Sequence, residues 1–234
     1  MGKNLIQQAR GKGSPTYAAP SFRYVADVKL RQGAWQGTIV DLERSQGHSA
    51  PLAKLLYSDG TSGYMIAPEG VHVGMTVETR TDAEVKIGNS ATIKNIPEGT
   101  FICNIEAIPG DGGRFARTSG TFGKIATKTS SKIIVILPSK KTKEFHPDCR
   151  ATIGLVAGSG RKEKPFFKAG NLYRAKAAKN KKYPSIGGAV QNAVDHPFGN
   201  KRSSRKSKAR PAPKNAPPGR NVGMIHPRRT GRKK

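Results

Sequence analysis

The 234 residues include 42 Lys and Arg against 15 Asp and Glu, which gives a formal net charge of +27. A chain this basic repels itself unless a polyanion neutralises it, so nucleic acid is the expected partner. No apolar run approaches the roughly 18 residues of a membrane span, and the first residues lack the apolar core of a secretory signal. We therefore expect no membrane partner and a cytoplasmic location, which also suits a chain with only two cysteines, Cys103 and Cys149.

The basic residues are unevenly distributed. Residues 151–234 hold 22 of the 42 Lys and Arg and only two acids, Glu163 and Asp195. This asymmetry favours a globular first part followed by a basic arm.

Residues 1–34 form the first expected segment, a basic N-terminal extension without a period of 2 or 3.6. Cations alternate there with glycines, prolines and aromatic rings, notably Arg10, Lys12, Arg23, Tyr17, Phe22 and Tyr24. Aromatics interleaved with cations are typical of a segment that lies along nucleic acid. The alternative is a disordered solubilising tail.

Residues 35–83 are predicted to form a small barrel of the oligonucleotide-binding (OB-fold) type. Strands are expected over residues 37–42, 52–57 and 63–67, with Asp59-Gly60 as a hairpin turn between the last two. Hydrophobic residues then alternate from Val71 to Val77, which predicts a further strand. Several short strands at this spacing favour a five-stranded barrel.

Residues 84–160 are predicted to form a second small barrel, of SH3-like size. Residues 83–94 bridge to it, and strands are expected over 99–108, 120–126, 132–137 and 150–156. The fold class is therefore all-β, with long irregular basic extensions at both ends.

The loop over residues 109–120 combines four glycines with Arg114 and Arg117. Glycines allow close backbone approach to phosphates, and guanidinium groups bind phosphates through two parallel hydrogen bonds. The loop lacks P-loop spacing, so nucleotide hydrolysis is not expected. A long hairpin with solvated charges is the alternative interpretation.

Residues 161–234 are predicted to be a basic C-terminal extension that penetrates RNA. A short helix is expected over 172–179, and residues 201–234 contain 13 cations, no acid and several prolines that prevent a packed core. Within this extension residues 192–199 carry almost no charge. Their prolines and glycines exclude a helix or a central strand, so they form an irregular loop around His196.

Two histidines invite a catalytic interpretation. His146 lies three residues before Cys149, but nothing specifies a pocket or a positioned imidazole, and two distant cysteines do not make a zinc site. His196 follows Asp195 and could be a general base, although contact with RNA is the simpler role.

Motifs throughout the chain resemble one family, the second protein of the large ribosomal subunit, in its archaeal and eukaryotic branch. The segments that carry the resemblance are 10–14, 49–54, 95–100, 109–111, 115–120, 149–154, 164–170, 194–199 and 228–232. Three departures lie near His196. Gln191-Asn192-Ala193-Val194 stands where the family usually has Met-Asn-Pro-Val. Gly187-Gly188 stands where the family usually has Arg-Gly, and the glycine run after the His-Pro motif is cut to Gly199-Asn200.

The resemblance implies an OB-fold-type barrel followed by an SH3-like barrel, bound to large-subunit rRNA with both tails threaded into RNA. It implies that the His196 loop approaches the peptidyl transferase region, and that the protein supports subunit association and peptide-bond formation in translation without being an enzyme. Expected partners are large-subunit rRNA, neighbouring large-subunit proteins and the small subunit across an intersubunit bridge. No cofactor is expected beyond Mg²⁺ associated with the rRNA.

The predicted RNA contacts are distributed over both barrels and both extensions. They are Arg10, Lys12, Arg23, Arg114, Phe115, Arg117, Thr118, Lys124, Arg150, Lys168, Arg174, Asn192, Asp195, His196, Arg202, Arg205, Arg228 and Arg229. Two other functions remain open, a Cys/His hydrolase or transferase with a basic targeting tail, and general compaction of nucleic acid.

Overall fold

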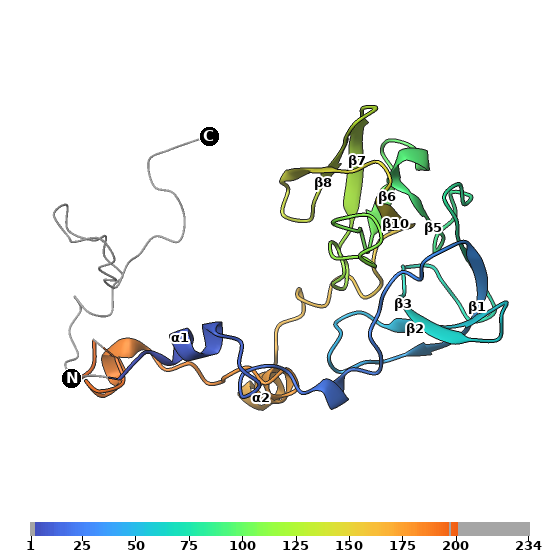
Figure 1. Cartoon of the computed structure of the whole chain (residues 1–234). Helices are drawn as coiled ribbons and strands as arrows, with labels where there is room; N and C mark the ends of the chain where they lie inside the picture. Colours follow the sequence, from blue (N-terminus) through green and yellow to red (C-terminus); the bar gives the residue numbers. More distant parts are fainter. Residues whose placement is uncertain (1–2, 197, 201–234) are drawn as a thin grey trace. The chain divides into compact units, whose positions relative to one another are not determined.

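The structure is a computed structural model that describes residues 3–196 and 198–200. It divides into two compact units (Figure 1). The barrel unit comprises residues 19–172. The loop unit comprises residues up to Ala18 together with those from Tyr173 onward.

The first half of the barrel unit contains four antiparallel strands around one apolar cluster. They are β1 (Trp35–Glu43), β2 (Leu52–Tyr57), β3 (Ser62–Ile66) and β4 (Thr76–Thr79). Strand β1 is central, because it pairs with β2 on one side and with β4 on the other. Side chains of alternating residues face inward and form the first core, which consists of Ile39, Ala53, Leu55, Tyr57, Met65, Ala67 and Val77.

The second half has its own, larger core. Its strands are β5 (Ser90–Thr92), β6 (Phe101–Cys103), β7 (Gly123–Lys128), β8 (Ile133–Ile136), β9 (Thr142–Phe145) and β10 (Arg150–Ile153). The buried cluster includes Ile93, Ile96, Ile102, Ile105, Ile125, Ile133, Val135, Phe145, Cys149, Ala151 and Ile153. Two strand groups with separate cores are the arrangement that we predicted, and the all-β prediction is confirmed.

The two strand groups are hydrogen-bonded to one another. The strand order is β3-β2-β1-β4-β5-β10-β6-β7-β8-β9, so β5 links the groups by pairing with β4 and with β10. A third buried cluster lies across this connection and includes Val28, Leu52, Ile66, Cys103 and Val156. Because Val28 is almost fully buried there, the segment before β1 is anchored to the barrel unit by hydrophobic burial.

The structure corrects several predicted strands. The alternation over residues 71–77 is mostly a turn, because Gly70 and Gly74 adopt positive φ and β4 begins only at Thr76. The strand predicted over 99–108 ends at Cys103, since Asn104 adopts a φ of 47°.

Strands β5 and β9 were not predicted. Strand β5 has only three residues, and they lie in the segment that we interpreted as the connection between the two barrels. Strand β9 carries exposed Lys143 and Glu144, and edge strands often carry such charged residues.

The described part of the loop unit contains little regular structure. Helix α1 spans Ile6–Gly11, α2 spans Ala169–Ala177 and begins in the barrel unit, and a 3-10 turn covers Gly188–Val190. The helix expected over 172–179 is therefore present but begins three residues earlier. Among the described residues no helix is long and apolar enough to cross a membrane.

Candidate nucleic-acid interface

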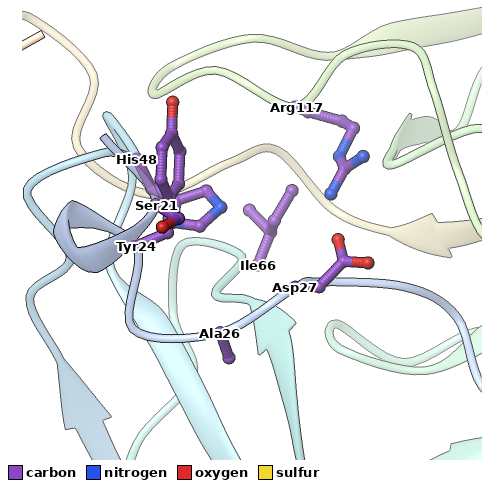
Figure 2. A pocket seen from close by; sticks show the side chains of 7 residues that line it. All are labelled: Ser21, Tyr24, Ala26, Asp27, His48, Ile66 and Arg117. Carbon is purple, nitrogen blue, oxygen red and sulfur yellow. The ribbon is translucent and has the colours of Figure 1, made fainter. Parts of the chain in front are cut away.

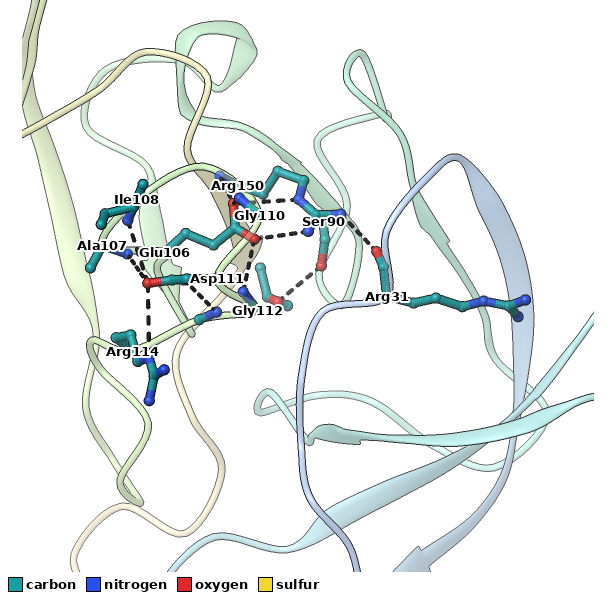
Figure 3. A network of polar contacts seen from close by, with 12 residues as sticks. Arg31, Ser90, Glu106, Ala107, Ile108, Gly110, Asp111, Gly112, Arg114 and Arg150 are labelled. Atoms are coloured by element: carbon teal, nitrogen blue, oxygen red, sulfur yellow. Dashed lines mark hydrogen bonds and ion pairs between the residues drawn. The ribbon is translucent and has the colours of Figure 1, made fainter.

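A buried ion pair organises the glycine-rich loop over residues 109–113 (Figure 3). Glu106 is fully buried, and its Oε1 accepts a hydrogen bond of 2.8 Å from Arg150, whose side chain is 12% exposed. The Arg150 guanidinium also donates to the backbone carbonyl of Arg31, at 2.7 Å. Burying an unpaired carboxylate or guanidinium costs free energy. Glu106 and Arg150 therefore each need the other as a counter-charge.

Glu106 also holds the loop backbone. The amides of Gly110 and Gly112 donate to its two carboxylate oxygens, each at 3.2 Å. Asp111 in turn accepts hydrogen bonds from the amides of Ala107 and Gly113, each at 3.0 Å. The loop is consequently built from its own backbone donors and two carboxylates, rather than being a solvated hairpin.

Gly113 is required at its position for two reasons. Its φ is +100°, and a Cβ atom there would lie 2.3 Å from the Asn104 side-chain oxygen. This close approach brings the loop against the end of β6, and the following residue, Arg114, extends outward with its side chain 65% exposed.

The predicted contacts of this region differ in accessibility. Arg114, Thr118, Lys124 and Lys168 are exposed and available to a partner. Arg117 is partly buried and donates to the carbonyls of Gly113 and Val28, and its burial lowers the pKa of the guanidinium.

Phe115 and Arg150 are used mainly inside the protein. The Phe115 ring packs edge-to-face on Phe145, with 5.4 Å between centroids, and Lys143 Nζ lies 4.3 Å from its centre. The Arg150 side chain is engaged by Glu106 and Arg31.

In the loop unit, Lys3 connects the N-terminal segment to the His196 loop. The Lys3 amide donates to the carbonyl of Val194 at 3.0 Å, and its ammonium lies 2.7 Å from Asp195 Oδ1. The sequence places these groups almost 200 positions apart, and no local pattern indicates the pairing. Lys3 is therefore a residue of this site that sequence analysis missed.

Steric fit determines where the His196 ring lies. A Cβ atom at Gly188 would come within 2.3 Å of the ring, so only glycine permits the observed contact. The ring also lies edge-to-face with Phe198, and its Nδ1 accepts a hydrogen bond from the Phe198 amide. Gly187 has open space around it, and the arginine that the family usually carries there would fit without a clash at Cβ.

The remaining predicted residues lie in both units or outside the described part. Arg10, Lys12, Arg174 and Asn192 belong to the loop unit, where Lys12, Arg174 and Asn192 are exposed. Arg23 belongs to the barrel unit and lies 5.6 Å from the Phe22 ring centre. Arg202, Arg205, Arg228 and Arg229 lie outside the described residues.

The two cysteines have the environment of structural residues. Both are fully buried, and desolvation raises the pKa of Cys103 to about 12 and that of Cys149 to about 11. A nucleophilic thiol needs the opposite shift. Among the described residues no group of three or more His, Cys, Asp or Glu side chains could hold a metal ion.

Comparison with known proteins identifies the family. Residues 6–79 match the family described as "Ribosomal Proteins L2, RNA binding N-terminal domain", and residues 86–216 match "Ribosomal Proteins L2, C-terminal domain". The chain belongs to the ribosomal protein L2 family. The two matched segments cover most of the chain, and the resemblance predicted from its motifs is confirmed.

Full-length relatives support the L2 assignment. The chain is 47% identical to "Large ribosomal subunit protein uL2" of Archaeoglobus fulgidus, and the similarity covers 99% of both chains. It is 44% identical to the protein of the same name from Methanococcoides burtonii, over 100% of both chains. The relative from Haloarcula marismortui is 44% identical over 99% of this chain and 98% of its own. L2 is a family of ribosomal proteins and not of enzymes, as predicted.

Proposed function

We propose that this chain is a constituent of the large ribosomal subunit and binds large-subunit rRNA. The observation that carries the proposal is the full-length similarity to proteins named as large-subunit components, with identities of 43–47%. A net charge of +27 has the sign and the size that a partner rich in phosphate requires.

The barrel unit supports the proposal through its exposed cations. Arg114 extends from a loop whose backbone is fixed by Glu106, so only its side chain has to be ordered when the guanidinium binds a phosphate. Lys124 on β7 and Lys168 before α2 add exposed positive charge. Such contacts position a protein on folded RNA by shape and charge rather than by base sequence.

The internal arginines have a different role in this proposal. Arg150 acts on the RNA through the loop that Glu106 organises, since its own donors are already bonded within the protein. Arg23 and Arg117 are partly buried, and each is packed or bonded within the barrel unit, Arg23 beside the Phe22 ring and Arg117 on the carbonyls of Gly113 and Val28.

The loop unit supports a role at an RNA surface. Exposed polar groups on a segment with almost no buried side chain need an external partner to satisfy and fix them. In the proposed function both extensions fill spaces between rRNA helices, and the His196 loop approaches the peptidyl transferase region without supplying a catalyst.

The same proposal includes specific partners and a cellular location. The protein would contact neighbouring large-subunit proteins, contribute to association with the small subunit across a bridge, and reside on cytoplasmic ribosomes. Mg²⁺ at its surface would be held by rRNA, because the described side chains offer no cluster for it.

Sedimentation of a native lysate through a sucrose gradient tests the proposal. The chain should comigrate with large subunits and whole ribosomes, and should stay bound through a salt wash that removes loosely associated factors. Recovery at the top of the gradient as free protein would refute the proposed function.

Salt dependence of binding to large-subunit rRNA fragments gives a quantitative test. With about eight cations on phosphates, the affinity should fall with a log-log slope of roughly −6 to −7. Equal affinity for DNA of the same length would instead favour general nucleic-acid compaction.

The enzyme alternative makes an opposite prediction about Cys149. Because its thiol is buried and its pKa is raised, it should remain unmodified by iodoacetamide in the native chain near neutral pH. A Cys149→Ala chain that still enters the large subunit but loses a hydrolase or transferase activity would restore that alternative.

A further inference from the structure

A cavity of about 560 Å³ opens on the barrel unit, beside the segment that precedes β1 (Figure 2). It is lined by Ser21, Tyr24, Ala26, Asp27, His48, Ile66 and Arg117. The cavity is within the size range of small-molecule sites, and it combines apolar walls with a few polar groups, as such sites do.

One side of the cavity is aromatic and fixed in position. Tyr24 and His48 pack edge-to-face with 5.2 Å between ring centroids. The backbone of Gly47 lies so close to the Tyr24 ring that an added Cβ would be 2.4 Å from it. Tyr24 nevertheless stays 42% exposed, so the ring is both immobilised and accessible.

The other side carries one donor group and one acceptor group. Figure 2 shows the Arg117 guanidinium and the Asp27 carboxylate pointing toward one another, with Ile66 between them and the aromatic pair. Two N–H groups of Arg117 donate to the carbonyls of Gly113 and Val28, which fixes the guanidinium. Among the described residues no further acceptor bonds its other three N–H groups.

The Asp27 carboxylate is available to a ligand. Its ion pair with Lys29, at 2.7 Å, is on the surface, with the two side chains 74% and 64% exposed. Exposed pairs of this kind contribute little free energy and exchange partners readily.

These groups fit a nucleobase better than a phosphate. Asp27 would repel a phosphate placed inside the cavity, whereas a base brings N–H donors for the carboxylate and a ring face for Tyr24. Guanine fits best, because its Watson–Crick edge presents two adjacent N–H donors to one carboxylate, and its O6 and N7 accept from arginine.

We propose that this cavity binds an unstacked guanine base of large-subunit rRNA, with Tyr24 as the stacking platform, Asp27 on the Watson–Crick edge and Arg117 on O6 and N7. The inference rests on the proposed function and assigns it a specific subsite. It also gives the segment around residues 21–27 a selective role beyond attracting phosphates.

Kethoxal probing of assembled large subunits tests the proposal, because this reagent modifies N1 and N2 of guanines whose Watson–Crick edge is free. Subunits are compared that carry the wild-type chain, Asp27→Asn or Tyr24→Leu as the sole copy. Asp148→Asn is the matched control, since Asp148 is also an exposed carboxylate paired with a lysine, Lys94.

We expect one rRNA guanine to become at least about fivefold more reactive in both Asp27→Asn and Tyr24→Leu subunits and unchanged in Asp148→Asn subunits. Unchanged kethoxal reactivity at every guanine in both variants would overturn the inference. So would an equal change in the Asp148→Asn control, or increased dimethyl sulfate reactivity at an adenine or cytosine in place of the guanine.

The same gradients separate this inference from the proposed function. A wild-type chain present in large subunits whose kethoxal pattern does not respond to either variant refutes the guanine site alone. A wild-type chain absent from the large subunits refutes the proposed function, and the guanine site falls with it.

Discussion

The barrel unit and the loop unit are held together by different interactions. The barrel unit encloses three clusters of buried apolar side chains, including Ile39, Ile102 and Ile125 with no exposed surface. In the described part of the loop unit, Gly199 is the only buried residue. Hydrophobic burial therefore stabilises the first unit and contributes very little to the second.

The described part of the loop unit relies instead on hydrogen bonds, the Lys3–Asp195 ion pair and close glycine contacts. The Lys3–Asp195 pair is 68% and 38% exposed, and pairs of this kind contribute at most about 1 kcal/mol. In the proposed function, a segment held this weakly would acquire its final order from the rRNA that it binds. The comparison teaches that the chain concentrates its hydrophobic stabilisation in the barrel unit and leaves the described part of the loop unit with almost none.

The largest expected effect is on the buried ion pair. Glu106→Gln would leave Arg150 buried without a counter-charge, and the free energy of unfolding of the barrel unit should fall by about 3–5 kcal/mol. Urea unfolding followed by the fluorescence of Trp35, the only tryptophan, measures it. Glu144→Gln, which removes an exposed carboxylate paired with Lys132, is the control and should cost less than about 1 kcal/mol. An equal decrease in the free energy of unfolding in the two variants would contradict the structural role of Glu106.

Apolar truncation tests the difference between the units directly. Ile102→Ala in the barrel unit should cost about 2–5 kcal/mol of unfolding free energy, because it leaves a cavity in the second core. Ile186→Ala in the loop unit, where the side chain is 57% exposed, should change stability by no more than about 0.5 kcal/mol. Denaturant titration of both variants provides the measurement. Similar destabilisation by both changes would mean that the loop unit has a core of its own.

A smaller, local effect is expected at Gly188. Gly188→Ala introduces a Cβ at the position of the His196 ring, and because that ring is the end of a side chain that can rotate, the change should displace the ring at little cost in stability and without altering barrel unfolding. The His196 Cε1–H resonance in a ¹³C-labelled chain reports ring position. Gly187→Ala is a matched control, because its φ is −63° and no atom lies within 4 Å of the added Cβ. An unshifted His196 resonance in Gly188→Ala would refute the steric fit.

The smallest effect concerns pH and the Arg31–Asp59 pair. Hydrogen bonds from Arg31 and Thr61 lower the pKa of Asp59 from its ordinary value of 3.8. A carboxyl group whose folded pKa is depressed adds stability above its unfolded pKa and loses it as the pH falls through the folded pKa. The midpoint difference between wild type and Asp59→Asn in thermal unfolding should therefore be present near neutral pH, begin to shrink as the pH falls below 3.8, and vanish only after the pH has passed the lower pKa of the folded state. A midpoint difference that does not depend on pH would mean that the substitution acts through packing and not through the charge of Asp59.

Sequence analysis located most of the strands, because β1, β2, β7, β8 and β10 contain β-branched and apolar residues between clear turn signals. It missed β5, since three residues give no measurable period, and β9, since its residues are mostly exposed and charged. It identified Arg114 and His196 as notable but not the residues that position them. Glu106 had one usable signal, an acid within an otherwise apolar run, which often marks a buried and paired carboxylate.

The sequence by itself determined the all-β class, the basic extensions, the nucleic-acid partner and the family, because these depend on composition, local periodicity and motifs contiguous in the chain. Tertiary structure alone decided that Arg150 faces Glu106, that Lys3 contacts the His196 loop, and that Tyr24, Asp27 and Arg117 surround one cavity. Each of these arrangements joins residues from separate segments. The register and packing that bring such residues together follow from burial of the whole core, which no local pattern encodes.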